Sequence, residues 1–319
     1  MPLDFSLWCD FIQKDFLEKE FVSLLDSGAI QGATSNPSIF AQSLKTSAYA
    51  AAIQALKGAK PKAIYEHLAI ADIKRAAEIL KPLWDKDKSK GFVSIEIDPF
   101  LSENAAKSID EGIRLYNAIA MPNVMIKVPA TPAGYEVMNA LTQRGINVNA
   151  TLIFTPNQAK ECAIALKEGI QTSHIQAVIS VFVSRFDRAV DTHLEQHLQA
   201  KMGIMNAMDC YGEIEHFKVD SIRTLFASTG VKSGDLPPSY YIDSLILPHS
   251  VNTAPLEAIR AYENSTNKAQ KSLISAQERN AFWAEVSKAG INYQNLSQKL
   301  LDEGLIAFQK SFEDMLRAL

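Results

Sequence analysis

Short apolar runs alternate with amphipathic segments along most of the chain. The apolar runs are Phe5–Cys9, Ile30–Thr34, Phe92–Ile97, Val124–Val128, Ile146–Phe154, Ala177–Val183, Thr224–Ala227 and Tyr240–Ile246. Between them, apolar residues recur at helical spacing in Lys14–Asp26, Pro61–Leu80, Glu103–Ile119, Tyr135–Gln143 and Pro156–Lys167. Such alternation is typical of parallel strands joined by crossover helices. Eight strands favour a closed barrel over an open sheet, so the pattern predicts an α/β fold, the (β/α)8 TIM barrel.

The end of the chain has a different pattern. From about Thr266 to Leu319 the apolar spacing is helical throughout, with Gly290 and Gly304 as expected breaks. The stretch Gly230–Ser239, with two prolines, predicts a loop and not a domain boundary. We therefore expect one domain over residues 1–319, with residues 266–319 as extra C-terminal helices packed on the barrel.

Composition and charge exclude several classes of protein. The net charge of −4 argues against a broad surface for nucleic acid or anionic membranes, but it leaves room for a small basic pocket. No apolar run approaches the ~18 residues of a membrane span. The N-terminus does not have the pattern of a signal peptide. Three scattered cysteines without a CxxC motif suit a reducing compartment. We expect a cytoplasmic protein.

Polar side chains occur within or just after the predicted strands. In α/β barrels the catalytic groups lie at the carboxyl ends of the strands, and polar groups inside apolar strands are costly unless they are paired or functional. The residues in such positions are Asp10, Asn36, Glu96, Lys127, Asn149, Thr151, Ser180, Arg185 and Lys232.

Lys127 is the clearest case, because it stands inside the run Val-Met-Ile-Lys-Val-Pro. Burial disfavours the charged form of a lysine, and a neutral amine is a nucleophile for a carbonyl carbon. The same position also suits a buried ion pair with Glu96 or Asp10. Spacing by itself leaves both interpretations open.

Five stretches resemble sequence blocks of the transaldolase family, in the order in which that family has them. Residues 32–40, GATSNPSIF, resemble the first signature, and residues 124–134, VMIKVPATPAG, resemble the signature that carries the Schiff-base lysine. Residues 145–154, GINVNATLIF, residues 180–185, SVFVSR, and residues 227–232, ASTGVK, resemble the later blocks. The two signatures together are highly specific, and the similarity covers most of the chain.

The resemblance implies covalent chemistry at Lys127. This lysine would attack the C2 carbonyl of a ketose phosphate and form an imine. Glu96, with Thr151 positioning a water, would move the protons of imine formation. Asp10 would take the proton of the C4 hydroxyl while the C3–C4 bond breaks, and the iminium would accept the electrons.

The resemblance also implies a set of substrate-binding residues. Amide and hydroxyl groups would hold the three-carbon fragment between half-reactions, and a guanidinium matches the geometry of a phosphate. The fragment would meet Asn36, Asn149, Ser180 and Phe182, and the distal phosphate would meet Arg185, Ser228 and Lys232. Arg223 is a second candidate for the phosphate.

Structural roles compete with several of these assignments. Asp10, Asn36 and Ser180 are residue types that favour helix N-caps, and Pro37 suits the first helical position after such a cap. Arg185 could instead pair with Asp187 or Asp191 on the surface. His193 and His197 have a spacing that can bind zinc, but a solvated helix face is the more usual meaning.

The function implied by the resemblance is transfer of a dihydroxyacetone unit. The donor would be sedoheptulose 7-phosphate or fructose 6-phosphate and the acceptor glyceraldehyde 3-phosphate or erythrose 4-phosphate, in the pentose phosphate pathway. Two alternatives stay open: a Schiff-base aldolase that releases dihydroxyacetone, and a catalytically silent sugar-phosphate-binding barrel.

The resemblance also bears on cofactors and partners. No metal or organic cofactor is expected, because the lysine supplies the electron sink. The expected partners are sugar phosphates, with no nucleic acid and no membrane. The assembly is expected to be a monomer or homodimer.

Overall fold

The computed structural model describes residues 4–172, 174–232, 236–266 and 268–319. Within these ranges parallel strands, each paired with the next in the chain and the last with the first, form a closed barrel in the order β1 to β8. The strands are β1 Phe5–Cys9, β2 Gly32–Thr34, β3 Phe92–Glu96, β4 Val124–Pro129, β5 Asn147–Ile153, β6 Ala177–Phe182, β7 Ile222–Ala227 and β8 Ser250–Ala254. The predicted TIM-barrel fold is confirmed.

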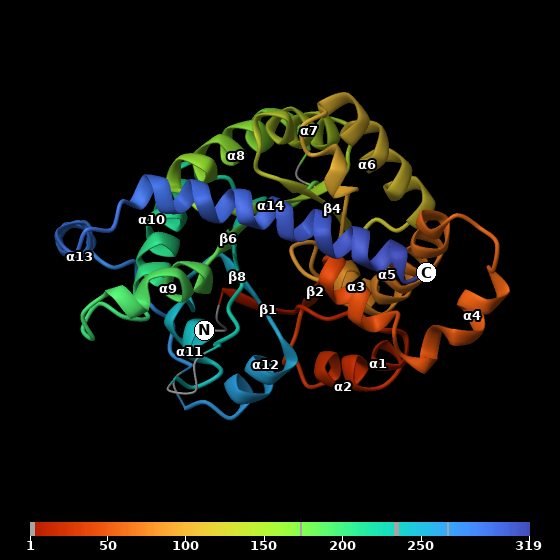
Figure 1. The fold of residues 1–319 in the computed structure, drawn as a ribbon, viewed down its shortest axis with the longest axis horizontal. Helices are drawn as coiled ribbons and strands as arrows, with labels where there is room; N and C mark the ends of the chain where they lie inside the picture. The colour runs from red at the N-terminus through yellow and green to blue at the C-terminus, as the bar shows by residue number, and fades with distance from the viewer. Residues whose placement is uncertain (1–3, 173, 233–235, 267) are drawn as a thin grey trace.

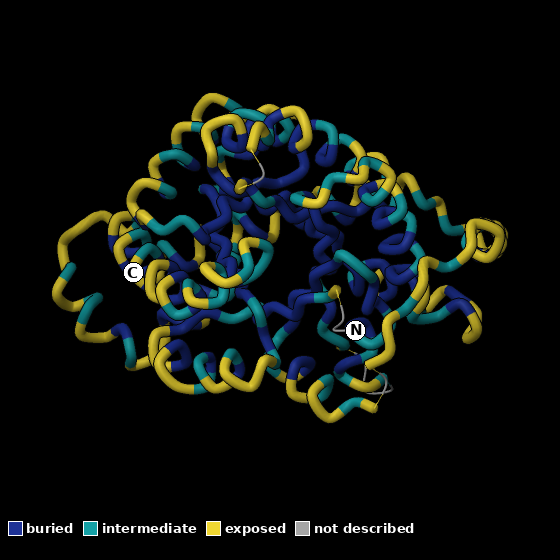
Figure 2. The backbone as a smooth tube through the Cα atoms, turned by 180° about the vertical axis from the view of Figure 1, so that it is seen from behind, coloured by how far each residue is buried: buried dark blue, intermediate teal, exposed yellow. Residues whose placement is uncertain are grey.

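Helices surround the barrel on its outside, and the last of them, α14, crosses one end (Figure 1). They are α1 Lys14–Leu17, α2 Glu20–Asp26, α3 Pro37–Ser43, α4 Ala50–Ala55, α5 Pro61–Lys86, α6 Ala105–Ile119, α7 Pro132–Gln143, α8 Pro156–Gly169, α9 Ser184–Val190, α10 Met202–His216, α11 Tyr240–Ser244, α12 Leu256–Glu263, α13 Ala276–Lys288 and α14 Tyr293–Arg317. Figure 2 shows the strands buried at the centre and the exposed positions on the outer helices.

Three turns from strand to helix are built from the same local signal. Asn36, Thr131 and Thr155 each accept a hydrogen bond from a backbone N–H of the first helical turn, and a proline follows each of them at the first helical position. A polar cap satisfies an otherwise unpaired N–H, and proline loses nothing there because its nitrogen needs no partner. This signal ends β2, β4 and β5 near the same face of the barrel.

The eighth strand is not where the apolar pattern predicted it. Tyr240–Ile246 begins with helix α11, and the barrel closes with β8 at Ser250–Ala254. In α11 the buried side chains Tyr241 and Ile242 are adjacent in the chain, followed by buried Leu245, which is a helical spacing. The true strand, Ser-Val-Asn-Thr-Ala, does not have the apolar pattern of a strand, because three of its five residues are polar. These polar residues are nevertheless buried, in a strand paired with β1 and β7.

The C-terminal region is helical in α13 and α14, with a break at Gly290, as predicted. Two details of the prediction are wrong. Residues 268–275 form no helix, and α14 continues through Gly304 without a break. Gly304 is a packing position, because a Cβ there would lie 2.9 Å from Leu152 Cδ2 and 3.3 Å from Arg185 Nη1.

Helix α14 lies across the carboxyl ends of the strands (Figure 1). It contacts α3, α9 and β5. The Ser311 hydroxyl lies 2.8 Å from that of Ser38, and the Tyr293 hydroxyl donates to the carbonyl of Phe154. These contacts at both ends hold α14 over the barrel mouth. Within the described ranges, every helix falls short of the length and hydrophobicity needed to span a bilayer.

Candidate active site

A cavity of about 180 Å³ lies at the carboxyl ends of the strands, beneath α14. Ligand sites of α/β barrels occupy this face, because each strand delivers a side chain or a loop to it. The cavity is lined by Asp10, Thr34, Asn36, Ser38, Lys127, Ser180, Phe182, Arg185, Ala227, Ser228, Thr253 and Phe308. Seven of the eleven predicted site residues are in this set.

Lys127 is held in a buried position between two neighbouring strands. In the sheet register, Lys127 stands beside Glu96 of β3 and Asn149 of β5, so the three side chains share one face. The Lys127 side chain is only 8% exposed, and its Nζ donates to the carbonyl of Ser35 at 3.2 Å. The Nζ also lies 3.8 Å from Glu96 Oε2. The predicted ion pair is therefore present, but it is long, and the lysine still reaches the cavity.

Burial favours the neutral forms of two carboxyl groups near Lys127. Burial raises the pKa of Glu96 to about 7, although the nearby Lys127 charge opposes this. Burial also raises the pKa of Asp10, against the effects of Lys127 and of a hydrogen bond from Thr34. A carboxyl group with a pKa near 7 can both give and take a proton at neutral pH, which is what acid–base catalysis requires.

The raised pKa of Glu96 predicts a pH effect on stability. Between its ordinary pKa of 4.5 and about 7, the folded protein keeps a proton that the unfolded chain has lost. Rising pH therefore favours unfolding across this window. Glu96→Gln removes this contribution, so its free energy of unfolding relative to wild type should rise by on the order of 2 kcal/mol from pH 5 to pH 8.

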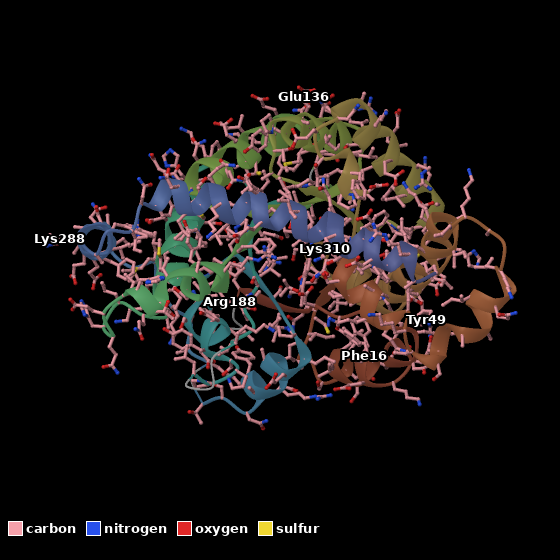
Figure 3. All side chains as sticks on the ribbon, in the orientation of Figure 1. Phe16, Tyr49, Glu136, Arg188, Lys288 and Lys310 are labelled. Carbon is pink, nitrogen blue, oxygen red and sulfur yellow. The ribbon has the colours of Figure 1, made fainter. Side chains whose placement is uncertain are left out.

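Denaturant unfolding at a series of pH values measures this difference. The exposed Glu136→Gln on α7 (Figure 3) is the charge-matched control and should follow wild type. Parallel curves for Glu96→Gln and wild type over the whole window would show that Glu96 is ionised in the folded protein.

Asp10 is oriented by a chain of hydroxyl groups. Thr34 Oγ1 donates to Asp10 Oδ1 at 2.7 Å, and Thr253 Oγ1 lies 2.7 Å from Thr34 Oγ1. Because the Thr34 hydrogen is directed at the carboxylate, Thr253 donates to Thr34. The capping alternative for Asp10 is wrong, since Gln13 caps α1. Sequence reasoning missed Thr34 and Thr253, whose contact depends on closure of the barrel between β1, β2 and β8.

Asn36 does cap α3, as one of its two interpretations predicted. Its Oδ1 accepts from the backbone N–H of Ile39 at 3.1 Å. The residue also lines the cavity. The amide side chain can serve both purposes, because the cap uses the oxygen and leaves the NH₂ group to donate to a ligand.

A second polar chain crosses the wall opposite Asp10. Ser180 Oγ donates to Asn149 Oδ1 at 2.6 Å, and Asn149 Nδ2 donates to Ser94 Oγ at 3.1 Å. The capping alternative for Ser180 is wrong, because it lies inside β6. These bonds fix the orientation of the Asn149 amide.

Thr151 follows Asn149 by two residues in β5, next to an irregularity of that strand. Its Oγ1 and the Oε2 of Glu96 are buried atoms without a hydrogen-bond partner among the described residues. The pairing of β5 with β6 shifts between Ala150 and Ile153, and Leu152 has a φ of 61°. A bulge and a left-handed residue re-aim neighbouring side chains and are frequent at functional sites.

Arg185 is free of the surface pairs considered from sequence. Asp187 accepts hydrogen bonds from the Gly203 N–H and the Tyr241 hydroxyl, and Asp191 accepts from the Ala200 N–H. Within the described ranges Arg185 makes no hydrogen bond or ion pair. Its guanidinium lies 5.1 Å from the centroid of the Phe182 ring, at the edge of the cavity. Its donors are therefore available to an anion.

The other predicted phosphate residues differ in position. Ser228 lines the cavity with a φ of 56°, and its hydroxyl lies 3.1 Å from that of Ser184. Lys232 is exposed, is not in the lining set, and precedes residues 233–235, which lie outside the described residues. Arg223 donates to Ser6 Oγ and the Ser250 carbonyl near the opposite end of the strands, so this candidate is wrong.

Phe308 was missed by sequence reasoning. It projects from α14 into the cavity, and Lys127 Nζ lies 5.8 Å from the centroid of its ring. A cation at that distance is attracted to the ring face. Phe308 shares the helical spacing of the other buried residues of α14, which is a signal of burial in the sequence. Only the course of α14 across the barrel mouth brings it to the lysine.

Sequence comparisons agree with this geometry. The family model described as transaldolase/fructose-6-phosphate aldolase matches residues 7–319. A transaldolase of Helicobacter pylori is 51% identical over 314 residues, which cover 98% of each chain. A transaldolase of Campylobacter jejuni is 46% identical over 330 aligned residues, which cover 99% of each chain. The chain belongs to the transaldolase/fructose-6-phosphate aldolase family.

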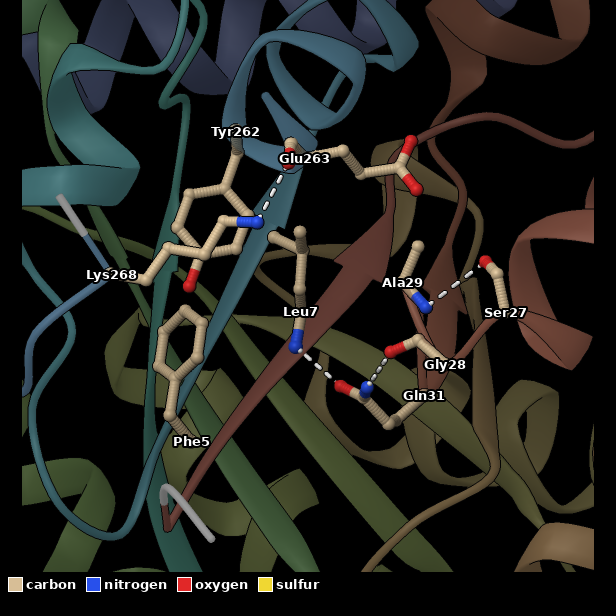
Figure 4. A pocket seen from close by; sticks show the side chains of 9 residues that line it. All are labelled: Phe5, Leu7, Ser27, Gly28, Ala29, Gln31, Tyr262, Glu263 and Lys268. Carbon is tan, nitrogen blue, oxygen red and sulfur yellow. Dashed lines mark hydrogen bonds between the residues drawn. The ribbon is translucent and has the colours of Figure 1, made fainter. Parts of the chain in front are cut away.

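A larger cavity lies elsewhere on this transaldolase-family barrel. It measures about 400 Å³ and is lined at the amino ends of β1 and β2 by residues that include Phe5, Gln31 and Tyr262 (Figure 4). The side-chain amide of Gln31 in this cavity is engaged in hydrogen bonds within the protein. It accepts from the Leu7 N–H and donates to the Gly28 carbonyl. The cavity beneath α14 is smaller, but it holds the lysine and a carboxyl group.

The two histidines considered for zinc are both exposed. His193 ends a short 3-10 helix, and His197 contacts the carboxylates of Glu195 and Glu285 on the surface. Among the residues that the structure describes, no group of three or more His, Cys, Asp or Glu side chains is placed to hold a metal ion.

Proposed function

We propose that this protein is a transaldolase that transfers a dihydroxyacetone unit between sugar phosphates through a Schiff base on Lys127. One observation carries the proposal. A buried lysine at a strand end reaches a cavity that also holds Asp10, with Glu96 3.8 Å from the lysine. The chain that builds this site is about half identical to proteins named transaldolase.

The first step is formation of the imine. The Lys127 amine adds to the C2 carbonyl of the ketose phosphate, and the resulting carbinolamine loses water to give the iminium. Protons must reach the departing oxygen and leave the nitrogen. The unpartnered buried oxygens of Glu96 and Thr151 support a proton relay through a water held between them.

The second step is cleavage of the C3–C4 bond. Asp10 takes the proton of the C4 hydroxyl, C4 becomes the carbonyl of the departing aldose, and the bonding electrons move into the iminium. Thr253 and Thr34 hold the carboxylate of Asp10 in place for this transfer. The reverse sequence joins the bound fragment to the carbonyl carbon of the acceptor.

The bound three-carbon fragment must survive until the acceptor arrives. The NH₂ group of Asn36 and the amide–hydroxyl pair of Asn149 and Ser180 would hold its hydroxyl groups. The rings of Phe182 and Phe308 would cover its apolar edge and keep water from the iminium. A positive iminium is also stabilised by the face of the Phe308 ring.

The distal phosphate would meet Arg185, with Ser228 beside it and Lys232 in the loop beyond. Arg185→Ala should lower kcat/KM for fructose 6-phosphate about 10- to 100-fold, because charge-assisted hydrogen bonds contribute roughly 1.5–3 kcal/mol. Cleavage of unphosphorylated fructose should change little. Steady-state kinetics on both sugars measures the difference.

The control for this variant is Arg144→Ala, which removes the same charge from an exposed residue after α7. It should leave both sugars unaffected. An equal loss on phosphorylated and unphosphorylated sugar in Arg185→Ala would mean that Arg185 supports the fold of the site and does not bind phosphate.

The proposal extends to the partners, the cofactors and the cell compartment of this protein. The partners are small sugar phosphates, and the lysine supplies the electron sink, so the chemistry needs no metal or organic cofactor. Three free, buried cysteines suit the reducing cytoplasm.

An acceptor assay separates this proposal from the two alternatives. Wild-type protein with fructose 6-phosphate as donor and erythrose 4-phosphate as acceptor should form sedoheptulose 7-phosphate and glyceraldehyde 3-phosphate, with little free dihydroxyacetone. Release of dihydroxyacetone in step with cleavage would identify an aldolase. Binding of the donor with no bond cleavage would identify a silent sugar-phosphate-binding barrel.

A further inference from the structure

The Lys127 amine has one hydrogen-bond partner among the described residues, the backbone carbonyl of Ser35. The Nζ donates to this oxygen at 3.2 Å, whereas its contact with Glu96 is longer, at 3.8 Å. A primary amine rotates about its Cε–Nζ bond, so a contact that fixes one N–H also restricts where the nitrogen lone pair points. That direction matters, because the lone pair attacks the carbonyl carbon of the substrate.

Ser35 is held by its side chain at the end of a short strand. Pairing of β2 with β3 ends at Thr34 and Ser94, and Ser35 is the next residue of the chain. Among the residues that the structure describes, neither its N–H nor its carbonyl takes part in a backbone–backbone hydrogen bond. Its hydroxyl instead donates to the Ser94 carbonyl at 2.8 Å. This bond extends the connection between the two strands by one residue and fixes the backbone whose carbonyl meets Lys127.

Ser35 reaches the site only through other groups. The residue is 0% exposed, and it does not line the cavity beneath α14, although its neighbours Thr34 and Asn36 do. Its hydroxyl therefore has no contact with a ligand in that cavity. Any effect of this side chain on the reaction must pass through the position of the Ser35 carbonyl, and so through Lys127.

The bond from Ser35 also connects the lysine to the residues proposed to hold the three-carbon fragment. Ser94 accepts from the Ser35 hydroxyl through its carbonyl, and from Asn149 Nδ2 through its own hydroxyl. Asn149 stands beside Lys127 in the register of β4 and β5, and its Oδ1 accepts from Ser180. The nucleophile and the fragment-binding residues thus share one hydrogen-bonded frame that includes Ser94.

We propose that Ser35 is a positioning residue for imine formation, whose hydroxyl holds the Ser35 carbonyl where it orients the Lys127 amine. The inference rests on the proposed function. One N–H of the neutral amine bonds this carbonyl, Glu96 Oε2 attracts the other, and the lone pair is left for the cavity that Lys127 lines. The lone pair forms the Nζ–C2 bond, the carbonyl π electrons move to the oxygen, and one proton passes from nitrogen to oxygen to give the carbinolamine.

The rate of imine formation tests this inference. Borohydride trapping at short times, over a range of fructose 6-phosphate concentrations, gives a plateau rate for the lysine adduct and a half-saturation concentration for binding. Ser35→Ala should lower the plateau about tenfold, because one orienting hydrogen bond is lost. The half-saturation concentration should stay within about twofold of wild type, since the side chain has no ligand contact. Ser35→Thr keeps the hydroxyl and should recover most of the plateau.

Ser108→Ala is the matched control. The Ser108 hydroxyl, on α6, is also buried and also donates to a backbone carbonyl at 2.8 Å, that of Leu101. Its loss should leave both the plateau and the half-saturation concentration as in wild type. If Ser35→Ala does not fold, Ser35→Cys replaces it, because a thiol fills nearly the same space and is a much weaker donor. The comparison is then between Ser35→Cys, which should lose the plateau rate, and Ser35→Thr.

Three results would overturn the inference. A wild-type plateau in the variants that lack the hydroxyl would show that the Ser35 hydroxyl does not act on Lys127. A half-saturation concentration that rises as much as the plateau falls would show that the hydroxyl supports the whole cavity, including the neighbouring Asn36. Absence of any adduct on Lys127 in the wild type would refute the proposed function and the inference with it, so the two failures are told apart by the wild-type protein.

Discussion

Replacing Lys127 with methionine is expected to lower transfer activity by more than about 10⁴-fold, which is the scale of the rate loss when an enzyme's covalent nucleophile is removed. Without the amine no imine forms, so the electrons of the C3–C4 bond have no acceptor. Methionine has a similar length and is apolar, so it suits a side chain that is 8% exposed. Glu96 then stays neutral, which its raised pKa already favours.

Borohydride reduction in the presence of fructose 6-phosphate measures this directly. Peptide mass mapping should find the reduced adduct on Lys127 in the wild type and no adduct in Lys127→Met. Lys86→Met, at the exposed end of α5, is the matched control and should keep both the adduct and the activity. An adduct on another lysine would leave the barrel intact and remove Lys127 from its assigned role.

Replacing Asp10 with asparagine should separate imine formation from bond cleavage. Asparagine can still accept the hydrogen bond of Thr34, so the local structure should be kept. It cannot take the C4 hydroxyl proton, and general-base catalysis contributes roughly 10²- to 10⁴-fold. We expect transfer to fall about 10³-fold within that range, while the adduct with intact ketose accumulates on Lys127.

Trapping at short reaction times distinguishes the two steps. The reduced adduct in Asp10→Asn should carry the mass of the whole ketose phosphate, whereas the wild-type adduct should carry mainly the three-carbon fragment. Asp15→Asn, an exposed acid in α1, is the control. A three-carbon adduct that forms at the wild-type rate in Asp10→Asn would assign the proton transfer to another group.

The local pattern of the chain was enough to predict much of the barrel. Seven of the eight predicted apolar runs overlap strands, and Lys127 stands in β4 as expected. Parallel strands buried on both faces are nearly continuous apolar runs, so a charged residue among them is visible without any structure. The prediction failed at β8, where Asn252 and Thr253 replace the apolar residues that mark a strand. Asn252 Oδ1 accepts a hydrogen bond from Thr229, and the Thr253 hydroxyl lies 2.7 Å from that of Thr34, so both side chains have polar contacts inside the barrel.

The remaining features of the site come from contacts between distant segments. Phe308 meets Lys127 only because α14 turns back over the barrel mouth, and Gly304 permits that close approach. Arg185 is available to an anion because the Asp187 carboxylate accepts hydrogen bonds from the Gly203 N–H and the Tyr241 hydroxyl instead. Periodicity records which side of an element is buried, since burial depends on the local backbone geometry. It does not record which remote side chain lies on the other side, because that depends on closure of the barrel and on the course of the chain beyond it.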